Sequence, residues 1–225
     1  MIIIVPRGAE AAAVRRAKPA ARIVEIAAGA GAARSLPDDL GRGEPIVVLG
    51  LCGALGDLRV GDVAVYDGIA GVRNAGDDGD WRTAGEAGAL RAMVDGRFVR
   101  ACTTDHVVTT VAERTALAAL HRADVVDMEG ASLAIELTRR GLHCAMLRVV
   151  SDDGERDLPA MDGVIAADGR LRAQRLARSF LRSPRSAIAF VRNARRALRR
   201  LEAVARTIAG AATAHDDGRS LTNSA

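Results

Sequence analysis

Two acidic residues that lie far apart in the sequence stand where predicted strands end. Asp152 follows the apolar run 145–150, and Glu129 lies where the short run 124–127 passes into a helix. A partly buried Asp152 would have a raised pKa and would hold a proton for a basic ring nitrogen. The two oxygens of Glu129 can accept hydrogen bonds from two sugar hydroxyls. Such a pair suits cleavage of a base from a ribose, because that reaction needs an acid for the base and negative charge near an oxocarbenium-like sugar.

Both carboxylates also have a structural interpretation. Acidic residues often occupy the first turn of a helix, where they cap backbone N–H groups and complement the helix dipole. Glu129 would then be a helix-capping residue, and Asp152 an acid that only ends a strand. The sequence leaves the two interpretations open, and convergence of both side chains on one pocket would favour the catalytic one.

A loop rich in glycine is predicted after the strand 45–50, with the sequence Gly50-Leu-Cys-Gly-Ala-Leu-Gly56. Glycines let the backbone approach a ligand closely. A dinucleotide site is a weak interpretation of this loop, because the spacing is GxxGxxG rather than GxGxxG and no clear helix precedes the next strand at Asp62.

The elements that position these residues alternate between strand and helix. Short apolar runs predict strands at residues 1–5, 22–27, 45–50, 62–69, 97–103, 124–127 and 144–150. Helices are predicted at 8–18, 111–122 (introduced by Thr110), 128–140, 171–182 and 185–209. This order predicts an α/β fold, a three-layer sandwich around a central, mainly parallel, mixed sheet, with ligands at the carboxyl ends of the strands.

Composition agrees with a folded globular chain, since 49% of the 225 residues are hydrophobic and 27% are charged. Aromatic residues make up 2%, so the core is expected to be aliphatic. We expect a catalytic domain over residues 1–183, a basic amphipathic helix over 184–209 and a mobile tail over 210–225, with a polar surface loop at 74–81.

Cysteine usage and the N-terminus indicate a cytoplasmic protein. Cys52, Cys102 and Cys144 are widely spaced without a CxxC pair, which predicts reduced thiols. His143 beside Cys144 lacks the further ligands that zinc needs, so we expect no metal, and no cofactor is expected either. The first apolar run ends at Pro6, too short for a signal peptide, and no run approaches a spanning helix.

The net charge of +4 is concentrated late in the chain. The arginines there are Arg170, Arg172, Arg175, Arg178, Arg182, Arg185, Arg192, Arg195, Arg196, Arg199 and Arg200. One face of the last predicted helix is apolar, formed by Ile188, Val191, Ala194, Leu198, Leu201, Ala205 and Ile208. This pattern is typical of a helix docked on its own domain or on another subunit, and also of one that contacts an anionic membrane, here through residues 185–208. Nucleic acid is the least favoured partner, because no binding motif is recognisable.

Four segments together resemble a known family. They are Gly50-Leu-Cys-Gly-Ala-Leu55, Val60-Gly-Asp-Val-Ala-Val65, Val126-Asp-Met-Glu-Gly-Ala131 and Arg148-Val-Val-Ser-Asp152. In this order they resemble the purine nucleoside phosphorylase and methylthioadenosine nucleosidase superfamily across residues 1–155. The short N-terminal half, the segment 152–159 and the arginine-rich helices are most similar to the hopanoid-associated phosphorylases, the branch assigned to removal of adenine from adenosylhopane in bacterial hopanoid synthesis.

The resemblance implies a phosphorylase/hydrolase-like fold that cleaves purine nucleosides. Asp152 would donate a proton to the base, Glu129 would bind the ribose hydroxyls and Met128 would pack against the sugar. Glu10 matches a position where nucleosidases keep a water-activating carboxylate, and is otherwise an ordinary glutamate on a helix surface. Val107 stands where nucleosidases often carry an aromatic residue. The other substrate contacts implied are Gly53, Thr104, Val108 and Ser151.

The attacking group is harder to assign. Phosphorylases of this superfamily carry an arginine and a serine for phosphate where this chain has Val48 and Leu51. Phosphate could instead be bound by Arg7 with Gly8, and by Thr104, because a guanidinium binds phosphate with two hydrogen bonds. The family name, rather than any residue, favours phosphorolysis of adenosylhopane with inorganic phosphate as co-substrate.

Two alternatives remain. One is a hydrolytic nucleosidase of the methylthioadenosine or adenosylhomocysteine type, and the other is a non-catalytic module that binds membrane or nucleic acid. The resemblance also implies a homo-oligomer, and a lipid-linked substrate would place the protein peripherally at the inner membrane.

Overall fold

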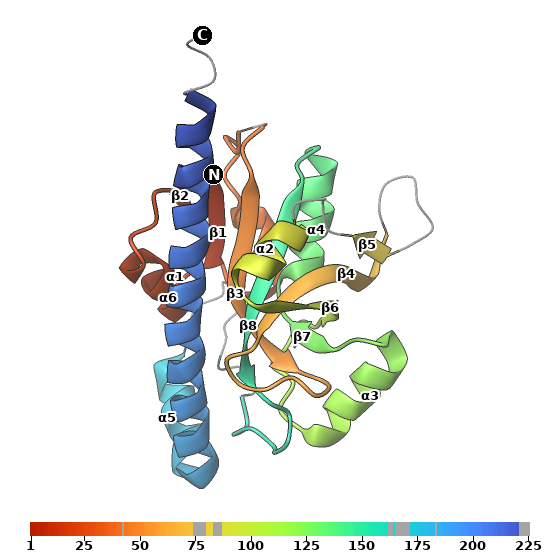
Figure 1. Ribbon diagram of the computed structural model, residues 1–225. Helices are drawn as coiled ribbons and strands as arrows, with labels where there is room; N and C mark the ends of the chain where they lie inside the picture. The colour runs from red at the N-terminus through yellow and green to blue at the C-terminus, as the bar shows by residue number, and fades with distance from the viewer. Residues whose placement is uncertain are drawn as a thin grey trace.

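The computed structural model describes residues 1–41, 43–73, 80–82, 87–161, 164, 172–182 and 184–220. Its strands are β1 (Ile2–Pro6), β2 (Arg22–Ile26), β3 (Ile46–Ala54), β4 (Val63–Arg73), β5 (Asp80–Arg82), β6 (Gly96–Thr103), β7 (Val125–Asp127) and β8 (Cys144–Asp152). Its helices are α1 (Ala9–Arg16), α2 (Ala87–Met93), α3 (Val111–His121), α4 (Gly130–Arg139), α5 (Ala173–Arg182) and α6 (Pro184–Ser220), with 3-10 turns at Gly29–Gly31 and Ala33–Ser35 (Figure 1). Within the described part of the chain, no helix is long and apolar enough to cross a membrane.

The described strands form one mixed sheet. Their order is β2-β1-β3-β7-β6-β4-β5, and β8 pairs with both β3 and β4. Five of the pairings between described strands are parallel and three are antiparallel. The mainly parallel sheet predicted for an α/β fold is therefore confirmed. The strands β3, β8, β4, β6 and β7 pair in a ring, so the centre of the sheet closes on itself, which the order of elements did not predict.

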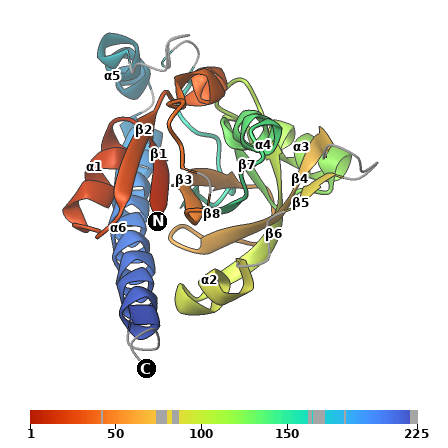
Figure 2. The ribbon, with the colours of Figure 1, turned by 90° about the horizontal axis from the view of Figure 1, so that it is seen from above.

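Both faces of the sheet are covered, as its continuous apolar strands require. Successive side chains of a strand point to opposite faces. Ile2 and Ile4 of β1 join a core that includes α4, whereas Ile3 and Val5 join a second core that includes α1 and α6. Figure 2 shows the sheet between α4 on one side and α6 on the other. The helices thus fix the strands whose ends carry the acidic residues.

The glycine-rich segment is mostly strand, which corrects the loop predicted after residue 50. β3 continues through Gly50 to Ala54, because the parallel β8 pairs with it as far as Gly53 and the antiparallel β7 pairs with Gly53 and Ala54. The register shifts between Cys52 and Gly53, and Gly53 lies opposite Asp152. β8 likewise continues two residues beyond its predicted end. This pairing places Asp152 beside Gly53, one residue before β3 ends.

Other elements agree with the prediction in type and differ at their ends. Thr110 caps α3, since its side chain accepts a hydrogen bond from the Glu113 N–H at 3.2 Å. Trp81 lies in β5 rather than in the predicted surface loop, and residues 74–79 of that loop lie outside the described residues. The helix α2 was not predicted.

The last helix is longer than predicted and is partly docked on the sheet (Figure 1). α6 continues to Ser220, so residues 210–220 are helical where a tail was predicted, and residues 221–225 lie outside the described part. Its buried face joins the second core through Ala197, Leu201, Val204, Ala205 and Ile208. Of the alternatives predicted for the face over 185–208, docking on the chain's own domain therefore holds for the second half, whose apolar side chains pack on the chain's own sheet and are not available to a membrane.

Candidate active site

One cavity of about 230 Å³ lies beside the ends of β6, β7 and β8. Every residue predicted to act on substrate or catalysis borders it, and these are Glu10, Gly53, Thr104, Val107, Val108, Met128, Glu129, Ser151 and Asp152. Arg7 and Gly8, proposed from the sequence for phosphate, are not among its lining residues. The structure thus brings the two acids onto one pocket, as the catalytic interpretation requires.

Glu129 occupies the N-cap position of α4, but its side chain makes no capping hydrogen bond. Asp127 takes that role, since both of its carboxylate oxygens accept from the Gly130 N–H at 3.1 Å. The Oε1 atom of Glu129 instead accepts a hydrogen bond from the Gly29 N–H at 2.7 Å. Burial raises the pKa of Glu129, and the charge of Arg148 acts against that rise. The carboxyl is therefore held at the pocket by a residue a hundred positions away.

A fully buried arginine lies behind these acids. The Nη2 atom of Arg148 is 3.3 Å from Asp127 Oδ2 and 3.5 Å from Glu129 Oε2. Burial alone would lower the pKa of Arg148, but the two carboxylates raise it above its ordinary value, so the guanidinium stays charged. Gly50 makes room for it, because a Cβ there would lie 1.8 Å from Nη1. This buried charge compensates the acids of the pocket.

Glu10, in the first turn of α1, points into the pocket rather than lying on an open helix surface. Its Oε1 atom accepts a hydrogen bond from the Leu51 N–H at 2.7 Å. Burial and the nearby charge of Glu129 raise the pKa of Glu10 to about 8. A group with that pKa can take up or release a proton near neutral pH.

Asp152 ends β8 with a side chain that is 13% exposed. It forms an ion pair with Arg114 of α3. Burial raises its pKa, Arg114 lowers it, and the balance lies above the ordinary value. Beside it, the Ser151 hydroxyl donates to the Cys52 carbonyl at 3.1 Å. Asp152 therefore combines access to the pocket with the proton affinity expected of an acid catalyst.

Sequence reasoning gave no role to Arg114, Asp127 or Arg148. A signal existed for two of them: Arg148 interrupts the apolar run of β8 and Asp127 ends that of β7, and a charge in a buried strand needs a partner. Arg114 gave no such signal, because an arginine on an amphipathic helix normally faces solvent. It is nevertheless buried on α3.

The charges around the pocket suit a substrate that becomes positive. Among the described lining residues the acids are Glu10, Asp127, Glu129 and Asp152. The lining residues that can carry positive charge are Arg114, which is paired with Asp152, and His106, whose ring nitrogens bond Asp105 and Glu113. Such a pocket stabilises a sugar that develops positive charge. It offers a phosphate no uncommitted arginine or lysine among the residues that the structure describes.

Solved structures share this fold at low sequence identity. Futalosine hydrolase of Helicobacter pylori strain 26695 is 15% identical, with a TM-score of 0.65, and the match covers 92% of this chain and 95% of that one. The 5'-methylthioadenosine/S-adenosyl homocysteine nucleosidase of Helicobacter pylori, in complex with a substituted pyrrolidin-3-ol, is 15% identical with a TM-score of 0.61, covering 90% and 94%. Arabidopsis thaliana 5'-methylthioadenosine nucleosidase is 17% identical with a TM-score of 0.60, covering 91% and 92%.

No curated protein matches the sequence. A family model does match, that of the phosphorylase superfamily, over residues 40–182. The matched segment is more than half of the chain and contains Arg114, Glu129 and Asp152, whereas Glu10 lies before it. The fold is that of nucleoside phosphorylases and nucleosidases. On this match, the chain belongs to the phosphorylase superfamily.

Proposed function

We propose that this protein hydrolyses the N-glycosidic bond of a purine nucleoside. The observation that carries the proposal is the convergence of Glu10, Glu129 and Asp152 on one pocket. Asp152 gives its proton to a purine ring nitrogen, and the C–N electron pair leaves with the base. Glu129 accepts hydrogen bonds from the ribose hydroxyls, and Glu10 takes a proton from the water whose oxygen bonds to the sugar carbon.

Water is favoured over phosphate by the charge of the pocket. An entering phosphate dianion would find no uncommitted arginine or lysine among the described lining residues, since Arg114 is committed to Asp152. Leu51 stands where a phosphorylase would carry a residue that binds phosphate. Its backbone N–H donates a hydrogen bond to Glu10 instead. Phosphorolysis, which the resemblance favours, is the competing outcome of the same experiment.

The experiment is product analysis with and without phosphate. Purified protein is incubated with 5'-methylthioadenosine or adenosine in ¹⁸O-labelled water, and Asp152→Asn serves as the control for contaminating activity. We expect free adenine and a sugar that carries ¹⁸O, whether or not phosphate is present. A sugar phosphate formed only when phosphate is supplied would overturn hydrolysis. If no base is released from any nucleoside, the non-catalytic alternative is the correct one.

We propose that the substrate is an adenine nucleoside with an apolar group at its 5' position. Support comes from the apolar part of the lining, which includes Val107, Val108 and Met128, and from the methylthioadenosine nucleosidases that share the fold. Adenosylhopane, methylthioadenosine, futalosine and adenosine are the compounds to compare by kcat/KM. The same preparation shows by light scattering whether the enzyme is a homo-oligomer, as we also propose.

We further propose that the exposed surface where α5 ends and α6 begins contacts an anionic membrane. Leu181 is 82% exposed and Ile188 70%, and both lie among exposed arginines. Between Asp168 and Glu202 the sequence holds no acidic residue. Exposed apolar side chains within a purely basic region match an anionic bilayer surface. A second copy of this chain is a poor match, because a two-fold contact would bring arginines against arginines.

Vesicle flotation tests this surface. Truncation of α6 is unsuitable, since its second half belongs to the core. We compare the wild type with a triple glutamine variant of Arg182, Arg185 and Arg192, and with a matched triple glutamine variant of Arg22, Arg59 and Arg97. We expect the wild type and the matched variant to float with phosphatidylglycerol vesicles and not with phosphatidylcholine alone. Failure of the wild type to float, or equal losses in both variants, would overturn the proposal.

A further inference from the structure

Arg114 is a buried arginine on α3, a helix whose other residues are exposed or partly buried. It is 3% exposed, and it is the residue of α3 that the structure shows as buried. It also lines the pocket. Burying a guanidinium is unfavourable unless its charge is compensated, so its contacts indicate why it is there.

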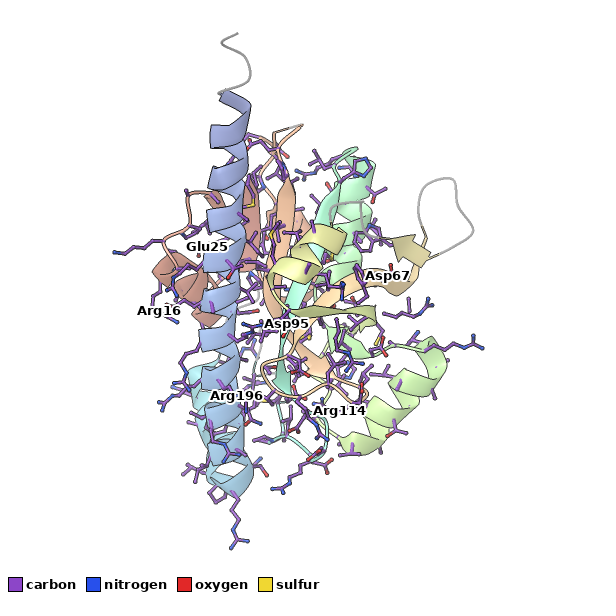
Figure 3. All side chains as sticks on the ribbon, viewed as in Figure 1. Arg16, Glu25, Asp67, Asp95, Arg114 and Arg196 are labelled. Atoms are coloured by element: carbon purple, nitrogen blue, oxygen red, sulfur yellow. The ribbon has the colours of Figure 1, made fainter. Side chains whose placement is uncertain are left out.

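Its contacts converge on the proposed acid. The Nη1 atom of Arg114 forms the ion pair with Asp152 Oδ1 and lies 3.2 Å from the Ala54 carbonyl oxygen. Nη2 donates to the Val108 carbonyl oxygen at 2.8 Å. Two backbone carbonyls thus fix the plane of the guanidinium, and the partner that carries charge is Asp152. Figure 3 shows Arg114 on the α3 side of the strand ends.

The surrounding backbone is shaped around this side chain. A Cβ on Gly53 would lie 3.1 Å from Arg114 Nη1, whereas a Cβ on Gly154 would meet the Ala54 carbonyl oxygen at 2.9 Å. Gly154 also has a φ of +70°, a conformation that side chains disfavour. The start of α3 is tied to the segment after Asp152, because the Val111 N–H donates to Asp157 at 2.8 Å. Gly53 therefore leaves room for the guanidinium, and the bond to Asp157 ties its helix to the segment that follows the acid.

We propose that Arg114 is the positioning residue of the general acid, which it orients toward the base and whose carboxylate it stabilises after proton transfer. This inference rests on the proposed function. When the proton passes from Asp152 to the ring nitrogen and the C–N electron pair leaves with the base, a negative charge appears at a largely buried carboxylate. Arg114 lies where that charge appears, so it lowers the energy of the transfer.

The charged groups that act on Asp152 are Arg114 from α3 and Asp153 beside it, and the Cys52 thiol of β3 lies close enough to be affected by it. Burial raises the pKa of Asp152 and Arg114 lowers it. Without the guanidinium, burial and Asp153 are opposed by the weaker effect of the hydrogen bond from Ser151, so the pKa of Asp152 rises further. The pH profile of kcat/KM should contain a limb that reports ionisation of Asp152 and that is absent in Asp152→Asn. In Arg114→Gln this limb should move to higher pH, by about 1 to 2 pH units.

Two substrates separate positioning of the acid from general support of the pocket. Release of adenine from 5'-methylthioadenosine needs an acid, whereas 4-nitrophenyl β-D-ribofuranoside has a leaving group that departs without protonation. We expect Arg114→Gln to lose about 10- to 100-fold in kcat on the nucleoside, with KM little changed, and less than about threefold on the nitrophenyl riboside. Arg114→Lys should return the pH limb most of the way to its wild-type position.

Arg140→Gln is the matched control. Arg140 is largely buried and is held by Glu136 and by the Pro37 carbonyl, but it does not line the pocket, so we expect no change. Equal losses of Arg114→Gln on both substrates, or an unmoved limb, would overturn the inference, and Arg114→Lys carries the comparison if the glutamine variant does not fold. A wild type that cleaves neither substrate would defeat the proposed function itself. If Asp152→Asn abolishes activity and Arg114→Gln leaves it unchanged, this inference alone is overturned.

Discussion

Replacing Glu10 by glutamine should stabilise the protein while removing its proposed catalysis. Burial and the charge of Glu129 raise the pKa of Glu10 from 4.5 to about 8. Between these values the folded chain keeps a proton that the unfolded chain releases, so stability falls as pH rises from about 4.5 to about 8 and is level above that. Glutamine does not titrate, and its side-chain oxygen can still accept from the Leu51 N–H.

The size of the gain follows from the same rise in pKa. A rise of about 3.5 pH units, at about 1.4 kcal/mol each, sets an upper bound of about 5 kcal/mol. Glu10 lines a cavity large enough to hold water, and hydration there would reduce the penalty, so we expect Glu10→Gln to gain about 2 kcal/mol at pH 8. At pH 5 Glu10 is protonated in the folded chain and only about half a pH unit past its midpoint in the unfolded chain, so the gain should shrink to about 0.5 kcal/mol.

The assay is urea unfolding of wild type and variant from pH 5 to pH 9. Glu136→Gln is a control of opposite sign, because hydrogen bonds from Arg139 and Arg140 lower the pKa of Glu136 to about 2. Its variant should be less stable than the wild type by an amount that does not change above pH 5. A gain in Glu10→Gln that stays constant across this range would refute the buried, high-pKa carboxyl. Wild-type turnover in that variant would refute its role toward water.

Three other substitutions test the site. Asp152→Asn should lower kcat by about a hundredfold or more with KM little changed, and undiminished adenine release in steady-state kinetics would contradict the acid role. Glu129→Gln should lower kcat/KM about tenfold or more for a ribonucleoside and less for its 2'-deoxy analogue, which lacks one bonded hydroxyl. Gly50→Ala should cost at least about 3 kcal/mol in urea unfolding, since its Cβ would lie 1.8 Å from Arg148 Nη1, whereas Gly56→Ala, with no atom within 4 Å of its Cβ, should be neutral.

The order and type of most elements follow from local sequence. Apolar runs of four or more residues predicted the central strands, and Thr110 marked the start of α3 correctly. What local patterns could not supply is pairing between distant segments. Gly50 to Ala54 look like a loop because glycine disfavours strands, and their distant partners β8 and β7 make them part of the sheet. The closed ring of strands likewise depends on antiparallel contacts of β3 with β7 and of β4 with β8.

The sequence predicted the acidic residues of the candidate site but not the arginines that pair with them. Glu10, Glu129 and Asp152 were found because they stand beside strand ends or match a family position, and all three border the cavity. Arg114 and Arg148 approach those acids from a helix and from the interior of a strand, so their roles depend on three-dimensional packing. A spacing rule along one segment cannot reveal a partner that arrives from another.

The pocket's charges indicate why it would favour a transition state over a bound substrate. Burial raises the pKa values of Glu10, Glu129 and Asp152, so each of these acids is reluctant to ionise in the free protein. A neutral nucleoside does not change that balance. A sugar that becomes cationic supplies the missing positive charge beside Glu10 and Glu129, and their ionised forms then stabilise it in return. The interaction is thus strongest when the glycosidic bond is breaking, which is the condition for lowering the barrier rather than tightening ground-state binding.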